Sequence, residues 1–218
     1  MARQQAPSIH RPENNVLHRI HRLAASIIGV YALIHLLNHL MALRSVASHI
    51  GFMENVRHIS RIPAVEAVLL ACVACQVGSG LYFVARRWRE RRELFDRLQA
   101  VSGAYLAFFL LVHVASVLYG RSALGLDTNF YFAAAGLHIS PFQLFFIPYY
   151  GMAVVALMMH VGCAFHYLSR ARIGQSIRDR IGYSSVAGGI VLASLILAAF
   201  SGAFYRVEIP QEYRATFQ

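Results

Sequence analysis

Residues 98–120 have the sequence LQAVSGAYLAFFLLVHVASVLYG, in which His113 is the only ionisable side chain besides two tyrosines. A helix of about 20 mostly apolar residues is long enough to cross the hydrocarbon core of a bilayer. A soluble domain rarely contains so long a run without a charge. This stretch therefore predicts a membrane-spanning helix.

Four further runs of the same kind flank this one, at about residues 23–43, 62–85, 143–169 and 183–205. Histidines aside, Glu66 is the only acidic or basic side chain in all five runs. Because lipid offers no partner to backbone polar groups, long apolar runs cross it as helices. We predict an all-α integral membrane protein, a five-helix bundle over residues 23–206, with a polar arm at 1–22 and a short tail at 207–218.

The basic excess follows the expected topology. The chain has 20 basic residues, all arginine, against 10 acidic ones, a formal net charge of +10. Such a charge can indicate nucleic-acid binding, but here arginines gather before the first run, between the second and third, and between the fourth and fifth. The positive-inside rule then predicts a cytoplasmic N-terminus and a C-terminus outside. We expect a membrane partner and no nucleic acid.

Two histidines at matching depth suggest a haem site. His35 and His113 lie about 13 and 15 residues from the inner ends of two helices that cross in the same direction, and His160 lies in the inner half of the fourth run. Two imidazoles on facing helices are suitable axial ligands for haem iron. Alternatively, each imidazole hydrogen-bonds a neighbouring helix, and His39, one turn from His35, could be the ligand instead.

Four other residues are candidates around this site. Gly103 could let a porphyrin edge approach the backbone, and Arg44 and Arg121 could pair with haem propionates or simply end helices at the headgroups. Glu66 could serve a quinone site or pair with Arg57 or Arg61. The sequence alone does not decide between these alternatives.

The stretch Gln99–His113, QAVSGAYLAFFLLVH, resembles the fourth span of the dihaem cytochrome b subunits of fumarate reductase and succinate dehydrogenase, in which Q-A-x-x-G, FF and V-H recur at this spacing. The resemblance covers about residues 15–206. It implies that His35 and His113 hold an outer haem and that His160, in MMHVG, holds an inner haem. It also places His21 and Arg22 near the inner haem propionates.

The chain departs from this family at two positions. The family carries the histidine opposite His160 on its second span, where this chain has Gln76 in CQVGSGL, and a glutamine amide is a poor iron ligand. The inner haem is then five-coordinate, ligated from elsewhere, or absent. A membrane glutamate of the family corresponds here to Met158, which puts a similar proton route in doubt.

The resemblance implies a subunit without dicarboxylate chemistry of its own, because the chain has no nucleotide-binding glycine loop and no cysteine cluster for iron–sulfur centres. Its expected role is electron relay through haem b, between flavoprotein and iron–sulfur partners on the cytoplasmic face and quinone. The expected location is the bacterial inner membrane, where complexes could form homo-oligomers. The alternatives are a haem-free membrane scaffold and a single-haem cytochrome b of another oxidoreductase.

Overall fold

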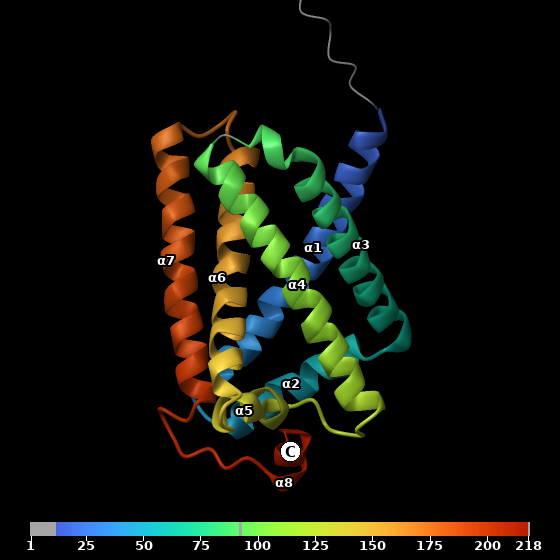
Figure 1. Cartoon of the computed structure of the whole chain (residues 1–218), viewed down its shortest axis with the longest axis vertical. Helices are drawn as coiled ribbons and strands as arrows, with labels where there is room; N and C mark the ends of the chain where they lie inside the picture. The colour runs from blue at the N-terminus through green and yellow to red at the C-terminus, as the bar shows by residue number, and fades with distance from the viewer. Residues whose placement is uncertain (1–11, 92, 218) are drawn as a thin grey trace, which may run out of the picture.

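The computed structural model describes residues 12–91 and 93–217, and all secondary structure in these ranges is helical (Figure 1). Residues 1–11, half of the predicted N-terminal arm, lie outside the described residues. The helices are α1 (Pro12–Met41), α2 (Val46–Ser60), α3 (Pro63–Arg87), α4 (Leu94–Ser122), α5 (Phe130–His138), α6 (Gln143–Leu168), α7 (Gln175–Phe200) and α8 (Gln211–Arg214), with single 3₁₀ turns at Trp88–Glu90 and Ala215–Phe217.

Five of these helices, α1, α3, α4, α6 and α7, are long and apolar enough to cross a membrane, as the sequence predicted. Their bounds differ from the predicted runs most at α1, which begins at Pro12, and at α7, which spans Gln175–Phe200 instead of 183–205. Backbone hydrogen bonding continues a helix through polar turns beyond its apolar stretch, so hydropathy places helix ends less well than helix centres. The chain is a multi-pass membrane protein; which end faces the cytoplasm stays a prediction.

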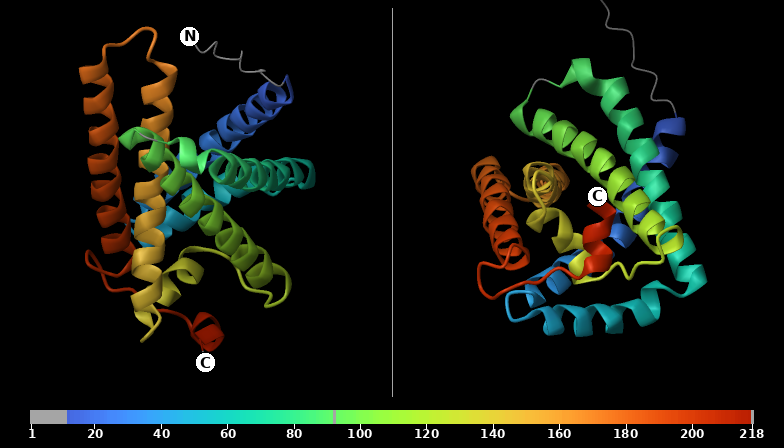
Figure 2. Two further views of the ribbon diagram at one scale, coloured as in Figure 1. Left: turned by 45° about the horizontal axis from the view of Figure 1, so that its top comes forward. Right: turned by 60° about the horizontal axis from the view of Figure 1, so that its bottom comes forward.

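Helices α6 and α7 lie side by side along most of their length (Figures 1 and 2). Glycines make this close approach possible: a Cβ at Gly162 would lie 2.7 Å from the Cβ of Ser185, and one at Gly189 would lie 3.2 Å from the Cα of Val155. Small residues at helix contacts are usual in membranes, where close packing rather than hydrophobicity drives association. α1, α3 and α4 diverge from this pair (Figure 2).

The bundle has two distinct ends, which we call the N-end and the C-end. The N-end carries the start of α1 and the α3–α4 and α6–α7 turns, while α2, α5 and α8 lie across the C-end (Figure 1). At the C-end the ring of Phe130 is fully buried and stacks on Phe200, with centroids 4.5 Å apart. The connections at 44–61 and 121–142 thus contain helices, α2 and α5, that lie across this end.

Local capping explains why these two short helices form. The Ser45 hydroxyl accepts a hydrogen bond from the Ser48 backbone N–H at the start of α2, and the Asn129 side chain accepts one from the Tyr131 N–H at the start of α5. Each cap satisfies a donor that the first helical turn leaves unpaired. Capping therefore stabilises two helices that are too short to span the membrane and that cover the C-end of the bundle.

Candidate functional site

A long cavity runs between α1, α3, α4 and α6 and reaches both ends of the bundle. Its volume is about 1470 Å³, and it extends from His21 and Arg91 near the N-end to Arg57 and Arg121 near the C-end. Most sites for a single ligand measure about 300 to 1,000 Å³. Most of its wall is hydrocarbon, for example Leu69, Val73, Leu106 and Leu110. The cavity is therefore large enough for more than one sizeable apolar ligand.

Four histidines, which we call the C-end histidine cluster, line the cavity toward the C-end: His35, His39, His49 and His113. Nε2 of His39 lies 3.1 Å from Nε2 of His35, and Nδ1 of His39 lies 3.3 Å from Nε2 of His49. Asn38 also approaches Nε2 of His49, at 3.3 Å. Three of the four imidazoles thus form a hydrogen-bonded chain.

His113 is the member outside this chain. Its ring stacks on Phe109, with centroids 5.0 Å apart, but neither ring nitrogen has a hydrogen-bond partner among the residues that the structure describes. A polar group deep in a membrane protein without a partner costs several kcal/mol, on the order of the price of an unsatisfied backbone group in lipid. The cavity-facing imidazole of His113 therefore points to a ligand.

The predicted pair His35 and His113 comes together in the fold, with ring centroids 6.0 Å apart. Two imidazoles on opposite sides of one iron, each at an N–Fe distance of about 2 Å, have ring centres about 6 Å apart. In the chain described above, however, Nε2 of His35 faces His39, and both nitrogens of His39 are engaged. Ligation through Nε2 of His35 would require it to release His39, whereas Nδ1 of His35 has no hydrogen-bond partner among the described residues.

His49 was not predicted to belong to the site. It lies on α2, outside the membrane-spanning helices, and is only 2% exposed. Burial lowers the pKa of His49 to about 4, and the nearby His35 and Arg57 act in the same direction. His49 is therefore neutral at pH 7. The sequence signal that could have found it is the Ser45 cap, which predicts a helix that folds back under the bundle.

At the N-end, the environment of His160 fixes its tautomer. Its Nδ1 lies 3.2 Å from the backbone oxygen of Gln99 and 3.1 Å from the hydroxyl of Ser102, which itself donates to the same oxygen. A carbonyl oxygen only accepts, so Nδ1 carries the proton and Nε2 keeps its lone pair. Nε2 has no partner among the described residues. Metal-binding histidines typically donate their other ring N–H to a backbone oxygen or carboxylate in this way.

Gly103 belongs to the N-end as well, not beside His113. A Cβ at Gly103 would lie 3.0 Å from Cε1 of His160, so the missing side chain makes room for this ring. Both Gly103 and His160 line the cavity. Gly103 thus supports the position of His160 in this structure.

His21 and Gln76 face the same part of the cavity. Nδ1 of His21 lies 2.7 Å from the Ser79 hydroxyl, and the Gln76 side-chain amide donates to the backbone oxygen of His21. Arg22 also lines the cavity and donates to the His18 backbone oxygen. Arg91, which the sequence analysis did not single out, has its Nε buried there without a partner.

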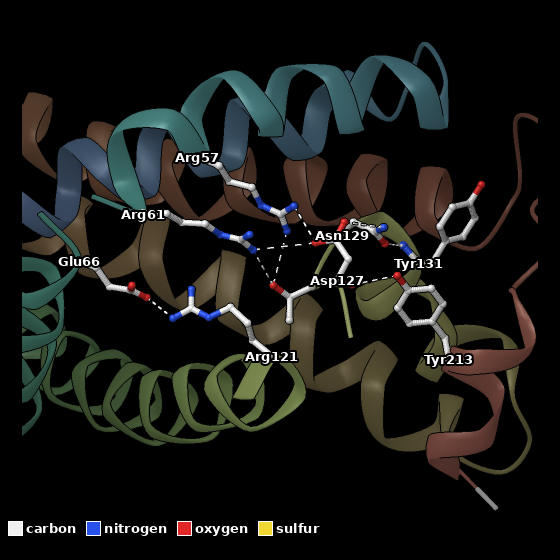
Figure 3. A network of polar contacts seen from close by, with 9 residues as sticks. Arg57, Arg61, Glu66, Arg121, Asp127, Asn129, Tyr131 and Tyr213 are labelled. Carbon is white, nitrogen blue, oxygen red and sulfur yellow. Dashed lines mark hydrogen bonds and ion pairs between the residues drawn. The ribbon is translucent and has the colours of Figure 1, made fainter. Parts of the chain in front are cut away.

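A polar network closes the cavity at the C-end (Figure 3). Arg57 pairs with Asp127 at 2.7 Å, and Arg121 pairs with Glu66, so Glu66 has a different partner from the two arginines expected. Tyr213 donates to the Asp127 backbone oxygen at 2.9 Å and ties α8 to this network. Arg44, by contrast, is exposed and does not line the cavity.

These residues fit a bound haem. The cavity is apolar along most of its length, and arginines lie toward both ends, as carboxylate side chains of a porphyrin require. In the part of the chain that the structure describes, Nε2 of His21, His113 and His160 has no hydrogen-bond partner. Among the described residues, no group of three or more His, Cys, Asp or Glu side chains is arranged to hold a metal ion. Such a group is what an ion held by side chains alone requires, whereas haem iron takes at most two ligands from the protein.

Comparisons with protein-family models, with curated proteins and with solved structures find no match. The resemblance of Gln99–His113 to the dihaem cytochromes b therefore stays a prediction from the sequence. The functional argument depends on the geometry of the cavity.

Proposed function

We propose that this chain is the haem-b-binding membrane subunit of a respiratory oxidoreductase of the succinate:quinone type. In this role it relays electrons between an iron–sulfur partner at the N-end and membrane quinone. The observation that carries the proposal is His113 on a membrane-spanning helix: its imidazole faces a large apolar cavity and has no hydrogen-bond partner among the described residues. Ionisable groups at such positions are costly and usually functional.

A second observation supports the same ligand. His160 keeps its Nε2 lone pair because Nδ1 is occupied by the Gln99 backbone oxygen. A structural histidine would use both nitrogens for hydrogen bonds when it is buried. Unsatisfied nitrogens at two levels of one cavity favour a ligand that coordinates through nitrogen at each level.

The charge at the N-end supports the proposed soluble partner and the side of the membrane on which it would dock. The N-end carries arginines from three separate segments, which would face an acidic soluble partner: Arg19, Arg22, Arg86, Arg89, Arg91, Arg97, Arg170, Arg172, Arg178 and Arg180. Charge complementarity of this kind steers association. The positive-inside rule assigns this end to the cytoplasm. In a bacterium, flavoprotein and iron–sulfur subunits would dock there.

The residues of the cavity would bind and tune the cofactor. Bound haem would supply one-electron transfer. His113 with His35 or His39, and His160 at the other level, would hold it from the sides, and the arginines would neutralise its carboxylates. Glu66 and Arg121, at the C-end mouth, are the polar pair that quinone would meet there.

The test is to purify the protein from native membranes in mild detergent and to record a dithionite-reduced minus oxidised spectrum, with haem quantified as the pyridine haemochrome. We expect haem b together with flavin and iron–sulfur signals from co-purifying subunits. Haem b without those signals would indicate a cytochrome of another oxidoreductase. Protein without haem would overturn the proposal.

A haem-free scaffold is the second candidate, and one observation favours it. His35, His39 and His49 bond one another, as purely structural histidines would. In a scaffold, both His35→Ala and His39→Ala would change only stability. If His35 is a ligand, His35→Ala removes a haem, while His39→Ala keeps it with an altered potential.

A further inference from the structure

Gln76 and His21 meet at the N-end in a way that bears on the ligand opposite His160. The Gln76 amide is engaged, because it donates to the backbone oxygen of His21. It therefore holds one turn of α1 against α3. Gln76, which itself lines the cavity, thus acts on the position of His21.

The imidazole of His21 lies against α3, one helical turn beyond Gln76. Its Nδ1 is 2.7 Å from the Ser79 hydroxyl, and a Cβ at Gly80 would lie 3.8 Å from its Cε1. Since α1 and α3 pack against each other here, His21 brings an imidazole to the surface of α3 from the neighbouring helix. The cavity wall at α3 thus carries a ring nitrogen that α3 itself does not supply.

The protonation of His21 follows from its partner. The Ser79 hydroxyl has a single proton and donates it to the Cys75 backbone oxygen. Ser79 therefore accepts from His21, so Nδ1 of His21 carries the proton and Nε2 keeps its lone pair. No described residue bonds this Nε2. His21 is in the same ligand-ready tautomer as His160.

The two histidines lie at similar depth. His21 is nine residues after the start of α1 and His160 is eight before the end of α6, or roughly 13 and 12 Å along the helices at about 1.5 Å per residue. Both line the cavity. They face the same space from opposite helices.

We propose that His21 supplies the axial nitrogen opposite His160, with Gln76 and Ser79 as positioning residues, so that α1 and α6 hold a second haem at the N-end. The inference depends on the proposed function, because it requires that the cavity bind haem. It gives the chain two haem sites although α3 carries no ligand. The N-end site would then use a helix pair, α1 and α6, held by residues of α3 and α4.

The experiment measures haem per protein and the redox potential of each haem in the full complex, for wild type, His21→Ala and His21→Met. The matched control is His18→Ala, one turn earlier on α1, where the imidazole stacks on Phe83 with centroids 4.2 Å apart. We expect two haems in wild type and in His18→Ala, and one in His21→Ala. The remaining C-end haem shows that the variant is folded.

His21→Met provides a readout that a structural role would not change. A thioether in place of an imidazole raises the potential of a haem. We therefore expect two haems in His21→Met, one with a more positive potential and one unchanged. An unchanged pair of potentials would overturn the assignment.

Further outcomes separate this inference from the proposed function. Two haems with wild-type potentials in His21→Ala would overturn the role of His21 and leave the function intact. The same conclusion would follow if the wild-type complex held a single haem that was lost in His113→Ala and retained in His160→Ala. Absence of haem from the wild-type complex would instead overturn the proposed function.

Discussion

The two ends of the cavity hold their histidines in different ways. At the N-end, His21 and His160 each give Nδ1–H to an oxygen of a neighbouring helix, Ser79 Oγ and the Gln99 carbonyl, and neither bonds another histidine. At the C-end, His35, His39 and His49 bond one another, and His113 bonds nothing among the described residues.

This difference determines what each imidazole can do. An acceptor that cannot donate fixes the proton on Nδ1 and leaves Nε2 free for a ligand. At the C-end the Asn38 amide can only donate to Nε2 of His49, so Nδ1 of His39 donates to that atom as well, and Nε2 of His35 donates to Nε2 of His39. The N-end histidines therefore keep Nε2 free for a ligand, while in the C-end histidine cluster Nε2 of His35, His39 and His49 is engaged and Nε2 of His113 has no partner among the described residues.

The largest expected effect comes from His113→Ala. Because no second imidazole at the C-end has a free Nε2, this variant should lose the C-end haem completely and retain the N-end haem. Haem per protein, measured as the pyridine haemochrome, should fall by half. His58→Ala, at an exposed histidine on α2, is the control and should keep full haem content. If His113→Ala kept the full haem content, His113 would not be the ligand on which the C-end haem depends.

Acid should weaken the C-end first. The pKa of buried His49 is about 4 against an ordinary 6.5, so the folded protein disfavours the charged imidazole. The stability that neutral His49 contributes is fully present above about pH 6.5 and is lost as the pH falls through about 4, up to about 3 kcal/mol. Thermal unfolding in detergent across this range measures it.

The variant His49→Gln should flatten this pH dependence, since glutamine does not titrate. His58→Gln on the same helix should leave the dependence as in wild type. An identical acid slope in both variants would show that another group governs the acid stability of the C-end.

The N-end can be weakened selectively through its hydroxyls. Ser79 Oγ is the acceptor for Nδ1 of His21, so Ser79→Ala should weaken haem retention about 10- to 100-fold, the usual cost of a lost second-shell partner. Ser102→Ala should cost less, because His160 keeps the Gln99 oxygen. Haem loss to apomyoglobin over time compares the two. Equal rates would show that these bonds do not position the rings.

The smallest expected effect is that of Gly103→Ala. The added Cβ would lie 3.0 Å from Cε1 of His160, so the ring must move by a few tenths of an ångström. We expect the N-end haem to remain with a shifted potential, and the C-end haem to be unchanged. Gly29→Ala, whose Cβ meets nothing within 4 Å, is the control for redox titration. A shift of the C-end potential instead would contradict the placement of Gly103.

Some of the candidate site follows from sequence, and some does not. Hydropathy located the five spans because apolar length is a local property, and depth counting brought His35 and His113 to the same level. It missed α2 and α5 because short capped helices carry no hydropathy signal. With these two helices the sequence reasoning missed His49. For Glu66 it left open a quinone site or a pair with Arg57 or Arg61, whereas the fold pairs Glu66 with Arg121.

The sequence by itself determined a five-helix membrane protein with histidines at two depths, since both depend on which residues follow one another along each helix. Only the tertiary structure decided which nitrogen of each histidine is free, because tautomers depend on acceptors from other helices. It also decided that the Gln76 amide, at the cavity wall, donates to the backbone oxygen of His21. That choice depends on how α1 packs against α3, which no single stretch of sequence encodes.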